Sequence, residues 1–382
     1  MAERAAHAGD GASLWQETSR TAGLGLDSLT GEVDADVCVV GLGGSGLTAA
    51  LELARAGVRV VGLDAGEVAR GAAGRNGGLL LAGARDFYHV ARETLGAERA
   101  LALYRATEAE QARIAEETPG VVRRTGSLRV AVDAREEADL EAQWDAMRKD
   151  ALEVSRASTP WGPALRVAGD LSFHPLARAR ALARAAAAAG ARLFENSRAV
   201  ELEGERVATD GGTVRAGHVL VAVDGGLERV LPELEGHVRT ARLQMLGTEP
   251  ATDVEVPAPM YLRYGYEYVQ QLASGELAVG GYRDRFEAEE WTHDARPTPG
   301  VQAEIEHFVR STLGTKARVT RRWAASVGYS NGPLPYYGEP RPGVLAFGGY
   351  SGTGNLIGAL CGRAAAARVR GERTALTELF EA

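Results

Sequence analysis

The sequence predicts an α/β fold in which a Rossmann-type nucleotide-binding domain is interleaved with an α+β domain built on an antiparallel sheet. Residues 36–64 have the pattern of strand, glycine-rich turn, helix and strand, and residues 344–369 repeat the first three of these elements. Long strands of a different kind lie between them, at 240–285. Domains that simply follow one another would not give this order. We therefore expect a nucleotide-binding domain at 34–90, 165–240 and 320–382, a substrate domain at 91–164 and 241–319, and an N-terminal arm at 1–33.

The first of these patterns has the glycine spacing of a dinucleotide-binding turn. Gly41, Gly43 and Gly46 follow a short apolar strand at the G-x-G-x-x-G spacing. The first glycine permits the tight turn, the second lets the backbone approach a pyrophosphate, and the third lets helix and strand pack closely. The phosphates would lie at the helix N-terminus, where unpaired N–H groups and the helix dipole favour an anion. Asp64 ends the next strand, where a carboxylate can accept hydrogen bonds from an adenosine ribose.

The remaining elements are predicted from the spacing of apolar residues. Apolar positions that recur every three to four residues indicate amphipathic helices, whereas short runs between turn residues indicate strands. Helices are predicted at 90–117, 136–152, 175–189 and 301–313, and strands at 127–132, 198–202, 207–209, 213–214 and 218–223. Residues 240–285 are predicted to form long antiparallel strands, among them 261–271 and 276–284.

Length, charge and composition exclude several classes of protein. The chain has 382 residues, which suits two domains. Its net charge of −8 argues against nucleic acid or an anionic membrane surface as a partner. Cys38 and Cys361 give no disulfide framework. Residues 1–20 lack an apolar signal segment and no run is long enough to span a bilayer, so we expect a cytoplasmic protein. The histidines show no metal-ligand spacing, so no metal is expected.

Three segments resemble the FAD-dependent amine and amino-acid oxidases of the D-amino-acid oxidase (DAO) family, in particular its gamma-glutamylputrescine oxidase-like branch. They are GLGGSG at 41–46 together with Asp64, ARGAAGRNGG at 69–78, and FGGYSGTGNLIGALCGR at 347–363. Many flavoproteins share the first segment, whereas the second and third together are specific. The resemblance implies FAD as the cofactor. Binding is expected to be non-covalent, because the proline-rich segment 328–338 contains no cysteine for attachment.

The resemblance also implies which residues hold the cofactor. Residues 75–78 would lie along the isoalloxazine ring, with Arg75 and Asn76 offering donors to the ring or the substrate. The turn at 348–355 would meet the opposite edge, and a helix beginning near Gly354 would stabilise negative charge on reduced flavin. The expected cofactor-binding residues are Gly41, Gly43, Gly44, Ser45, Gly46, Asp64, Ala65, Arg70, Gly74, Arg75, Asn76, Gly77, Gly78, Val200, Gly349, Gly352, Thr353, Gly354 and Asn355.

Substrate contacts are expected from the strands of the second domain. Tyr264, Tyr266 and Tyr268 alternate, so on a single strand they would share one face. Tyr268 matches the position of the family's active-site tyrosine. Arginines at 263, 283 and 285 are candidates for binding a substrate carboxylate. The predicted catalytic residues are Tyr268, Arg75, Asn76 and Tyr350.

The chain departs from the branch at several positions. Asp64 stands where a glutamate is usual, Ala73 where serine is frequent, and Thr353 where histidine is common. Tyr268 is followed by Val269 and Gln270, whereas the branch has an arginine after the tyrosine. Because of this last departure, the substrate of the branch is not carried over to this chain.

Together these features predict an FAD-dependent oxidase or dehydrogenase. It would oxidise the C–N bond of an amine or amino acid by hydride transfer to flavin N5, and the imine would then hydrolyse. Oxygen or another acceptor would reoxidise the flavin. Two alternatives remain open: oxidation of a 2-hydroxy acid on the same scaffold, and a non-catalytic FAD-binding subunit of a larger complex.

Overall fold

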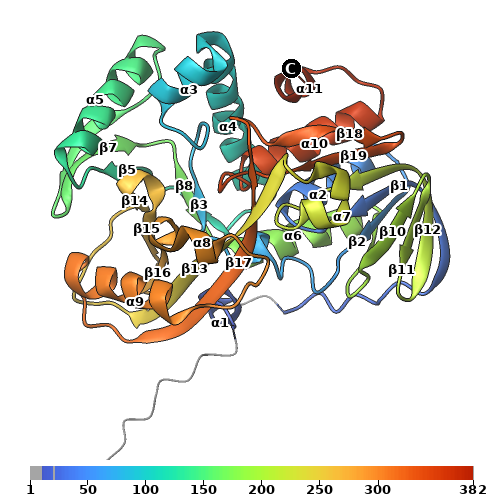
Figure 1. Cartoon of the computed structure of the whole chain (residues 1–382), viewed down its shortest axis with the longest axis horizontal. Coiled ribbons are helices and arrows are strands. Elements are labelled where there is room, and N and C mark those ends of the chain that lie inside the picture. Colours follow the sequence, from blue (N-terminus) through green and yellow to red (C-terminus); the bar gives the residue numbers. More distant parts are fainter. Residues whose placement is uncertain (1–10, 20–21, 382) are drawn as a thin grey trace, which may run out of the picture.

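Two eight-stranded sheets form the centre of the computed structural model, which describes residues 11–19 and 22–381 (Figure 1). The first ten residues of the predicted N-terminal arm lie outside this range. A smaller sheet has the order β3 (Leu79–Leu80), β8 (Leu171–Phe173) and β4 (Val122–Arg123). The predicted mixed α/β fold is confirmed.

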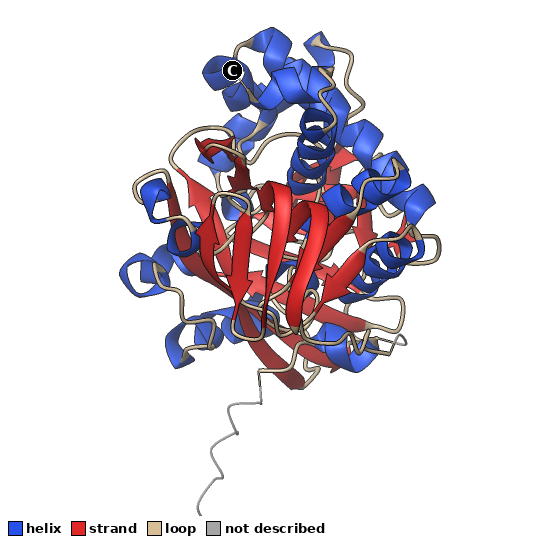
Figure 2. Cartoon of the chain, turned by 90° about the vertical axis from the view of Figure 1, so that its right-hand side faces the viewer, coloured by secondary structure: helices blue, strands red, loops and turns tan. Residues whose placement is uncertain are grey.

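The first sheet is built around β1 (Gly31–Val40), whose Val37, Cys38 and Val39 are fully buried. Burial of consecutive residues is typical of a parallel strand covered on both faces. β1 pairs in parallel with β2 (Val60–Leu63) and β12 (Gly212–Val221), β2 with β9 (Arg192–Phe194), and β12 with β19 (Val344–Gly348). Antiparallel β10 (Ala199–Glu203), β11 (Arg206–Thr209) and β18 (Tyr336–Arg341) extend the sheet, and Figure 2 views the molecule from this side.

Three helices share a core with this sheet: α2 (Gly44–Arg55), α6 (Pro175–Ala188) and α10 (Ile357–Val369). Small residues allow α2 and α10 to approach closely, since a Cβ on Gly362 would lie only 2.4 Å from the Ser45 carbonyl oxygen. A Cβ on Gly358 would lie 3.6 Å from the Ser45 Cβ. The first turns of α2 and α10 therefore lie side by side.

The second sheet is antiparallel except where β14 pairs with β5. Its strands, in spatial order, are β17 (Val319–Ser330), β13 (Val238–Pro250), β16 (Glu276–Gly281), β15 (Glu267–Gln271), β14 (Met260–Leu262), β5 (Ser127–Val130), β7 (Gly162–Val167) and β6 (Ser155–Thr159). A bridge between Tyr329 and Tyr350 joins its first strand to the turn after β19. The remaining helices are α1 (Leu14–Thr18), α3 (Tyr88–Leu95), α4 (Ala97–Glu117), α5 (Ala134–Lys149), α7 (Leu227–Val230), α8 (Glu287–Glu290), α9 (Pro299–His307) and α11 (Ala375–Phe380).

The single strand predicted at 261–271 is wrong. The chain turns sharply between β14 and β15, where Arg263, Tyr264 and Gly265 all have positive φ angles of +45°, +59° and +86°. The two strands form an antiparallel hairpin in which Tyr261 faces Tyr268. Tyr264 and Tyr266 therefore do not share a strand face with Tyr268, and they are 42% and 38% exposed.

Other predicted elements differ in their ends. The helix expected at 90–117 is two helices separated at Gly96, whose φ of +82° interrupts the helical backbone. The strands expected at 213–214 and 218–223 are one strand, β12, because both segments pair with β1. The helix expected to begin near Gly354 begins at Ile357, after further turns.

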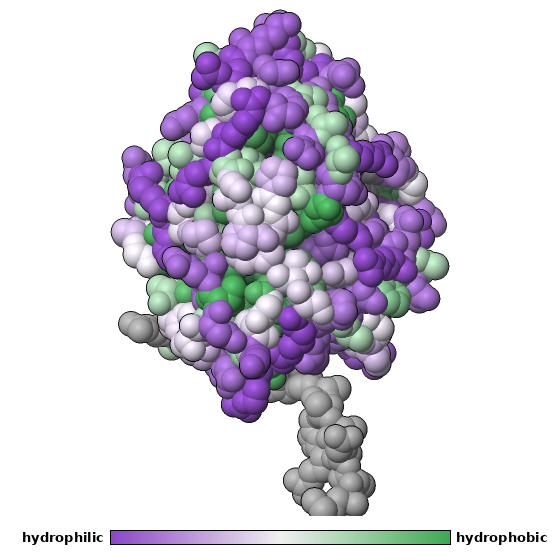
Figure 3. Space-filling model, turned by 90° about the vertical axis from the view of Figure 1, so that its left-hand side faces the viewer, coloured by the Kyte–Doolittle hydropathy of each residue, from purple (hydrophilic) through white to green (hydrophobic). Residues whose placement is uncertain are grey.

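The face on the side of α5 and α9 carries hydrophilic side chains with small hydrophobic groups between them (Figure 3). Among the described residues, no helix combines the length and the apolar composition needed to cross a membrane.

Candidate active site

A cavity of about 930 Å³ runs along both large sheets and the glycine turns that precede α2 and α10. Its size lies within the range of small-molecule and cofactor sites. The structure brings most of the predicted site residues into its lining, namely Gly41, Gly43, Gly44, Ser45, Asp64, Ala65, Arg70, Arg75, Asn76, Gly77, Tyr268, Tyr350, Gly352, Thr353, Gly354 and Asn355. Five predicted residues lie outside the lining: Gly46, Gly74, Gly78, Val200 and Gly349.

Four of these five are glycines that the packing of the protein itself requires. A Cβ on Gly46 would lie 1.9 Å from the Gly41 carbonyl oxygen, and one on Gly74 would lie 2.2 Å from the Ala69 carbonyl oxygen. Gly78 has a φ of +72° and would meet Gln270, while Gly349 has the same φ and would meet Ser330. These glycines pack against other parts of the protein, on the side of the cavity wall that faces away from the cavity.

Val200, predicted to contact the cofactor, is not among the residues that line the cavity. Its side chain is 55% exposed, and the pairing of β10 with β11 shifts register between Ala199 and Glu201. The cavity is instead lined at this point by the preceding residues Ser197, Arg198 and Ala199.

The turn before α2 has the geometry of an anion site. Gly41 has a φ of +98°, which a side chain rarely adopts, and a Cβ there would meet the Ala222 carbonyl oxygen at 2.8 Å. By contrast, a Cβ on Gly43 would have only Ala73 within 4 Å, at 3.6 Å. Gly43 thus faces open space, next to the unpaired N–H groups of the helix.

Asp64 lies at the end of β2 and holds two loops together. Its carboxylate accepts hydrogen bonds from the backbone N–H groups of Leu42 and Gly66, each at 3.0 Å. Burial raises the pKa of Asp64 to about 6, although these two N–H groups oppose the shift. Each carboxylate oxygen retains further acceptor capacity for a ligand in the cavity.

The loop at residues 75–78 is fixed through its carbonyl groups. The indole N–H groups of Trp323 and Trp15 donate to the carbonyl oxygens of Arg75 and Asn76, both at 2.8 Å. The side-chain amide of Gln270 donates to the carbonyl oxygens of Gly77 and Gly78, at 2.5 and 3.2 Å. Side chains distant in sequence therefore hold this loop against the cavity.

Asn76 does not offer free donors, contrary to the prediction. Its amide nitrogen donates to the carbonyl oxygens of Ala72 and Ala73, at 3.0 and 3.1 Å. Its amide oxygen accepts from Gly78 N–H and from the Asn355 side chain. Asn76 is thus a positioning residue that ties the 75–78 loop to the turn before α10. Arg75 donates to the Ala324 carbonyl oxygen and keeps other N–H groups for a ligand.

The turn before α10 presents backbone to the cavity. Gly352 has a φ of +94°, and a Cβ there would meet nothing within 4 Å. The buried Asp224 carboxylate holds the turn by accepting from the N–H groups of Gly349 and Tyr350, both at 3.0 Å. The Tyr350 ring is buried beneath Gly354, whose Cβ would lie 3.0 Å from it. Tyr350 therefore supports the turn, and its predicted catalytic role stays a prediction.

The wall of the cavity formed by β14 and β15 is aromatic. The rings of Tyr261 and Tyr268 meet edge to face, 6.1 Å apart. Tyr268 also abuts the 75–78 loop, since a Cβ on Gly77 would lie 3.1 Å from its ring. Burial raises the pKa of Tyr268, so its hydroxyl stays protonated at neutral pH. Tyr264 and Tyr266 also line the cavity, but from the hairpin turn.

Of the three arginines predicted to bind a carboxylate, only Arg283 lines the cavity. Arg263 is paired with Glu267 and Asp284, and Arg285 with Glu304. The Arg283 guanidinium carbon lies 4.7 Å from the Tyr329 ring centre and 5.0 Å from that of Trp291. Its Nη1 is buried and has no hydrogen-bond partner among the described residues. An unpaired donor in this position can bind an anionic group.

Sequence reasoning missed several lining residues, among them Tyr261, Arg129, Arg178 and Tyr329. Gly265, between two strand-like runs, is a turn signal that could have indicated the hairpin and hence the pairing of Tyr261 with Tyr268. Arg129 and Arg178 could not be identified as lining residues from the sequence, because an arginine on an amphipathic element is most often solvated.

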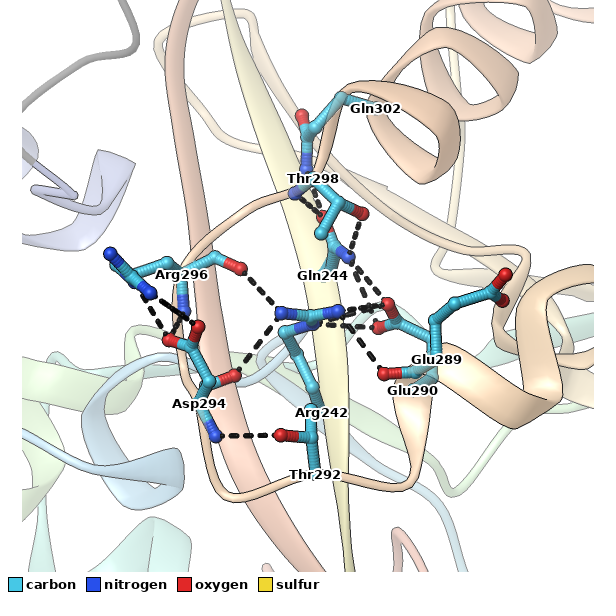
Figure 4. Close-up of polar contacts among 9 residues, drawn as sticks. All are labelled: Arg242, Gln244, Glu289, Glu290, Thr292, Asp294, Arg296, Thr298 and Gln302. Atoms are coloured by element: carbon cyan, nitrogen blue, oxygen red, sulfur yellow. Dashed lines mark hydrogen bonds and ion pairs between the residues drawn. The ribbon is translucent and has the colours of Figure 1, made fainter.

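A buried ion pair fixes the loop between α8 and α9, which lines part of the cavity. The Arg242 guanidinium donates to both Glu290 carboxylate oxygens and to the carbonyl oxygens of residues 289, 294 and 296 (Figure 4). Gln244 donates to Glu290 and Thr298 in the same cluster. The loop contributes His293 and Ala295 to the cavity lining.

The charge of the lining favours anionic ligands. Among the described residues it contains eight arginines and three aspartates, with no lysine or glutamate. Asp224 already accepts three backbone hydrogen bonds, and Asp64 accepts two. A phosphate-bearing cofactor and a carboxylate-bearing substrate both suit such a lining.

Comparisons with known proteins agree with this geometry. The chain is 30% identical to the probable oxidoreductase OrdL of Rhizobium meliloti (strain 1021), over 91% of this chain and 86% of the relative. It is 28% identical to the gamma-glutamylputrescine oxidoreductase of Escherichia coli (strain K12), with the same shares covered. Its fold is similar to that of glycine oxidase from Geobacillus kaustophilus, with a TM-score of 0.73 at 21% identity over 90% of this chain and 96% of the other.

The family assignment rests on most of the chain. Residues 36–368 match the family described as FAD dependent oxidoreductase (DAO). This range contains both glycine turns, the 75–78 loop and the hairpin of β14 and β15. The predicted resemblance is therefore confirmed: the chain is an oxidoreductase and belongs to the DAO family of FAD-dependent oxidoreductases.

Proposed function

We propose that this chain oxidises the C–N bond of an amine or amino acid, with non-covalently bound FAD as the electron acceptor. One observation carries the proposal: a single cavity connects the glycine turn at α2, which suits a dinucleotide, to the wall formed by Tyr268, Tyr261 and Arg283. When bound, FAD supplies hydride acceptance at N5, and oxygen or another acceptor restores it. The parallel sheet would then form an FAD-binding domain and the antiparallel sheet a substrate domain, with β17 belonging to the substrate domain although the predicted boundary at 320 placed it in the FAD-binding domain.

The chain's own residues would bind and orient the reactants. Gly43 and the first turn of α2 would face the pyrophosphate, and Asp64 the ribose. The 75–78 loop and the turn at Gly352 would hold the two edges of the flavin, since Asn76 and Asn355 fix them relative to each other. Tyr268 and Tyr261 would exclude water and hold the carbon that is oxidised beside the flavin.

The substrate would carry a carboxylate bound by Arg283. We expect Arg283→Met to lower kcat/KM for a carboxylate-bearing substrate roughly 10- to 100-fold, because a hydrogen bond to a charged group contributes about 1.5–3 kcal/mol. Arg285→Met is the matched control, since Arg285 is exposed and paired with Glu304. Steady-state kinetics of both variants, together with their bound FAD, measure the effect. Equal losses in the two variants would contradict this role of Arg283.

The flavin should be released without covalent attachment. Cys38 and Cys361 are fully buried and neither lines the cavity. Burial raises the pKa of Cys38 to about 12, which suppresses the reactive thiolate. Acid precipitation should leave FAD in the supernatant, identified by chromatography. Yellow colour that stays in the pellet, or a released cofactor other than FAD, would overturn this part of the proposal.

The function is tested by anaerobic bleaching of the flavin. The purified protein is mixed with amines, D- and L-amino acids, N-methyl amino acids and 2-hydroxy acids, and the absorbance of the flavin is followed. We expect rapid reduction by at least one nitrogen-bearing compound with a carboxylate. Rapid reduction by a 2-hydroxy acid alone would favour hydroxy-acid oxidation, and no reduction by any compound would favour a non-catalytic FAD-binding subunit.

A further inference from the structure

Arg178 is a buried arginine that faces the glycine turn at the start of α2. It lies in the first turns of α6, is 4% exposed and lines the cavity. A Cβ built on Gly44 would have only one atom within 4 Å, the Arg178 Nη1 at 3.6 Å. The guanidinium therefore lies beside the backbone that begins α2.

The guanidinium has no anionic partner within the described part of the chain. Among the described residues, its Nε is buried without a hydrogen bond and no carboxylate forms an ion pair with it. Burial lowers the pKa of Arg178 to about 10, so the side chain remains charged at neutral pH. Glu110 and Glu117 raise this pKa from a distance, but both are paired with Arg363. Within the described ranges the one contact of Arg178 with an aromatic ring is with Phe173, whose centre lies 6.0 Å from the guanidinium carbon.

Two other buried arginines are paired with carboxylates, whereas Arg129 donates to the Gln143 side chain. Arg242 is bound by Glu290, and Arg363 by Glu52, Glu110 and Glu117. A buried charge without a counterion is costly, so native proteins pair such charges. The unpaired cation at Arg178 and the N-terminus of α2 both face the same part of the cavity. This arrangement is complementary to a multiply charged anion.

We propose that Arg178 binds the pyrophosphate of the dinucleotide cofactor, beside the glycine turn. The inference rests on the proposed binding of FAD. In this arrangement Gly43, the N–H groups of α2 and the adjacent guanidinium would all contact the pyrophosphate. The phosphate site then consists of two separate parts of the chain, only one of which the G-x-G-x-x-G spacing reveals.

The test measures FAD release from the holoenzyme. Arg178→Met keeps the apolar stem beside Phe173 and removes the charge, and Arg178→Lys keeps a charge. Arg184→Met, an exposed position on the same helix, is the control. After dilution, flavin fluorescence reports the release rate, and the ratio of FAD to protein is measured after purification. We expect release roughly 10- to 100-fold faster for Arg178→Met, intermediate for Arg178→Lys and unchanged for Arg184→Met.

Each outcome has a defined meaning. Release from Arg178→Met within twofold of the wild-type rate would overturn the inference. Equal acceleration in Arg178→Met and Arg178→Lys, with both variants unfolding at lower temperature, would make Arg178 a packing residue and also overturn it. If Arg178→Met fails to fold, Arg178→Lys is the deciding variant. A release rate for Arg178→Lys equal to that of the wild type would contradict the expected intermediate rate and overturn the inference. Wild-type protein that contains no FAD would instead contradict the proposed function.

Discussion

Replacing Arg242 with methionine is expected to lower the free energy of unfolding by about 3–5 kcal/mol, because it leaves the Glu290 carboxylate buried without its counterion. Glu290 has no exposed surface, and the guanidinium supplies most of its hydrogen bonds (Figure 4). Urea unfolding of FAD-saturated protein measures the loss. We expect weaker substrate binding as well, since the loop that carries His293 loses its attachment to β13.

A matched control lies in the same cluster. Arg296 pairs with Asp294, but its side chain is 87% exposed, so Arg296→Met should leave the free energy of unfolding nearly unchanged. The double variant Arg242→Met, Glu290→Met removes both charges and should recover much of the stability. If the two single variants destabilise equally, or the double variant is less stable than Arg242→Met, burial of the pair is not the source of the effect.

Substitutions in the glycine turn should separate packing from cofactor binding. Gly46→Ala is expected to cost about 3 kcal/mol or more and to abolish FAD binding, because its Cβ would lie 1.9 Å from the Gly41 carbonyl oxygen and force α2 away from the turn. Gly43→Ala has room within the protein, so it should fold normally yet bind FAD weakly, since the added methyl group would occupy the space proposed for the phosphates. Thermal unfolding and FAD titration distinguish the two variants.

This pair of variants tests two different roles for the same motif. If Gly43→Ala binds FAD as tightly as the wild type, the second glycine does not face the cofactor. If Gly46→Ala remains stable, the close contact between α2 and the turn is not required.

Local sequence patterns predicted the parts of the site that depend on backbone conformation. The glycine at position 41 marked a real positive φ angle, and the strand–turn–helix pattern at 344–369 located the second glycine turn. Such features are encoded within a few residues, because a tight turn or a close approach excludes most side chains. The same signal did not distinguish glycines that face the cavity, such as Gly43, from those that pack behind it, such as Gly46.

Roles that depend on partners distant in sequence could not be predicted in the same way. Asn76 and Arg75 are neighbours with similar donors, yet the amide of Asn76 is used within its own loop and the guanidinium of Arg75 retains free N–H groups. Arg178 and Arg184 both lie in α6, and they differ in that Arg178 is buried whereas Arg184 is exposed. The hairpin of β14 and β15 was not predicted, because the alternation of Tyr264, Tyr266 and Tyr268 indicates a single strand and only one residue between them, Gly265, indicates a turn.

The most direct test of the central claim is the nitrogen balance of a single anaerobic turnover. The protein is mixed with a substoichiometric amount of the compound that bleaches its flavin fastest, and both the flavin reduced and the ammonia or amine released are quantified. Oxidation of a C–N bond predicts one ammonia or amine, and one carbonyl product, for each flavin reduced. Flavin reduction without any release of nitrogen would contradict it.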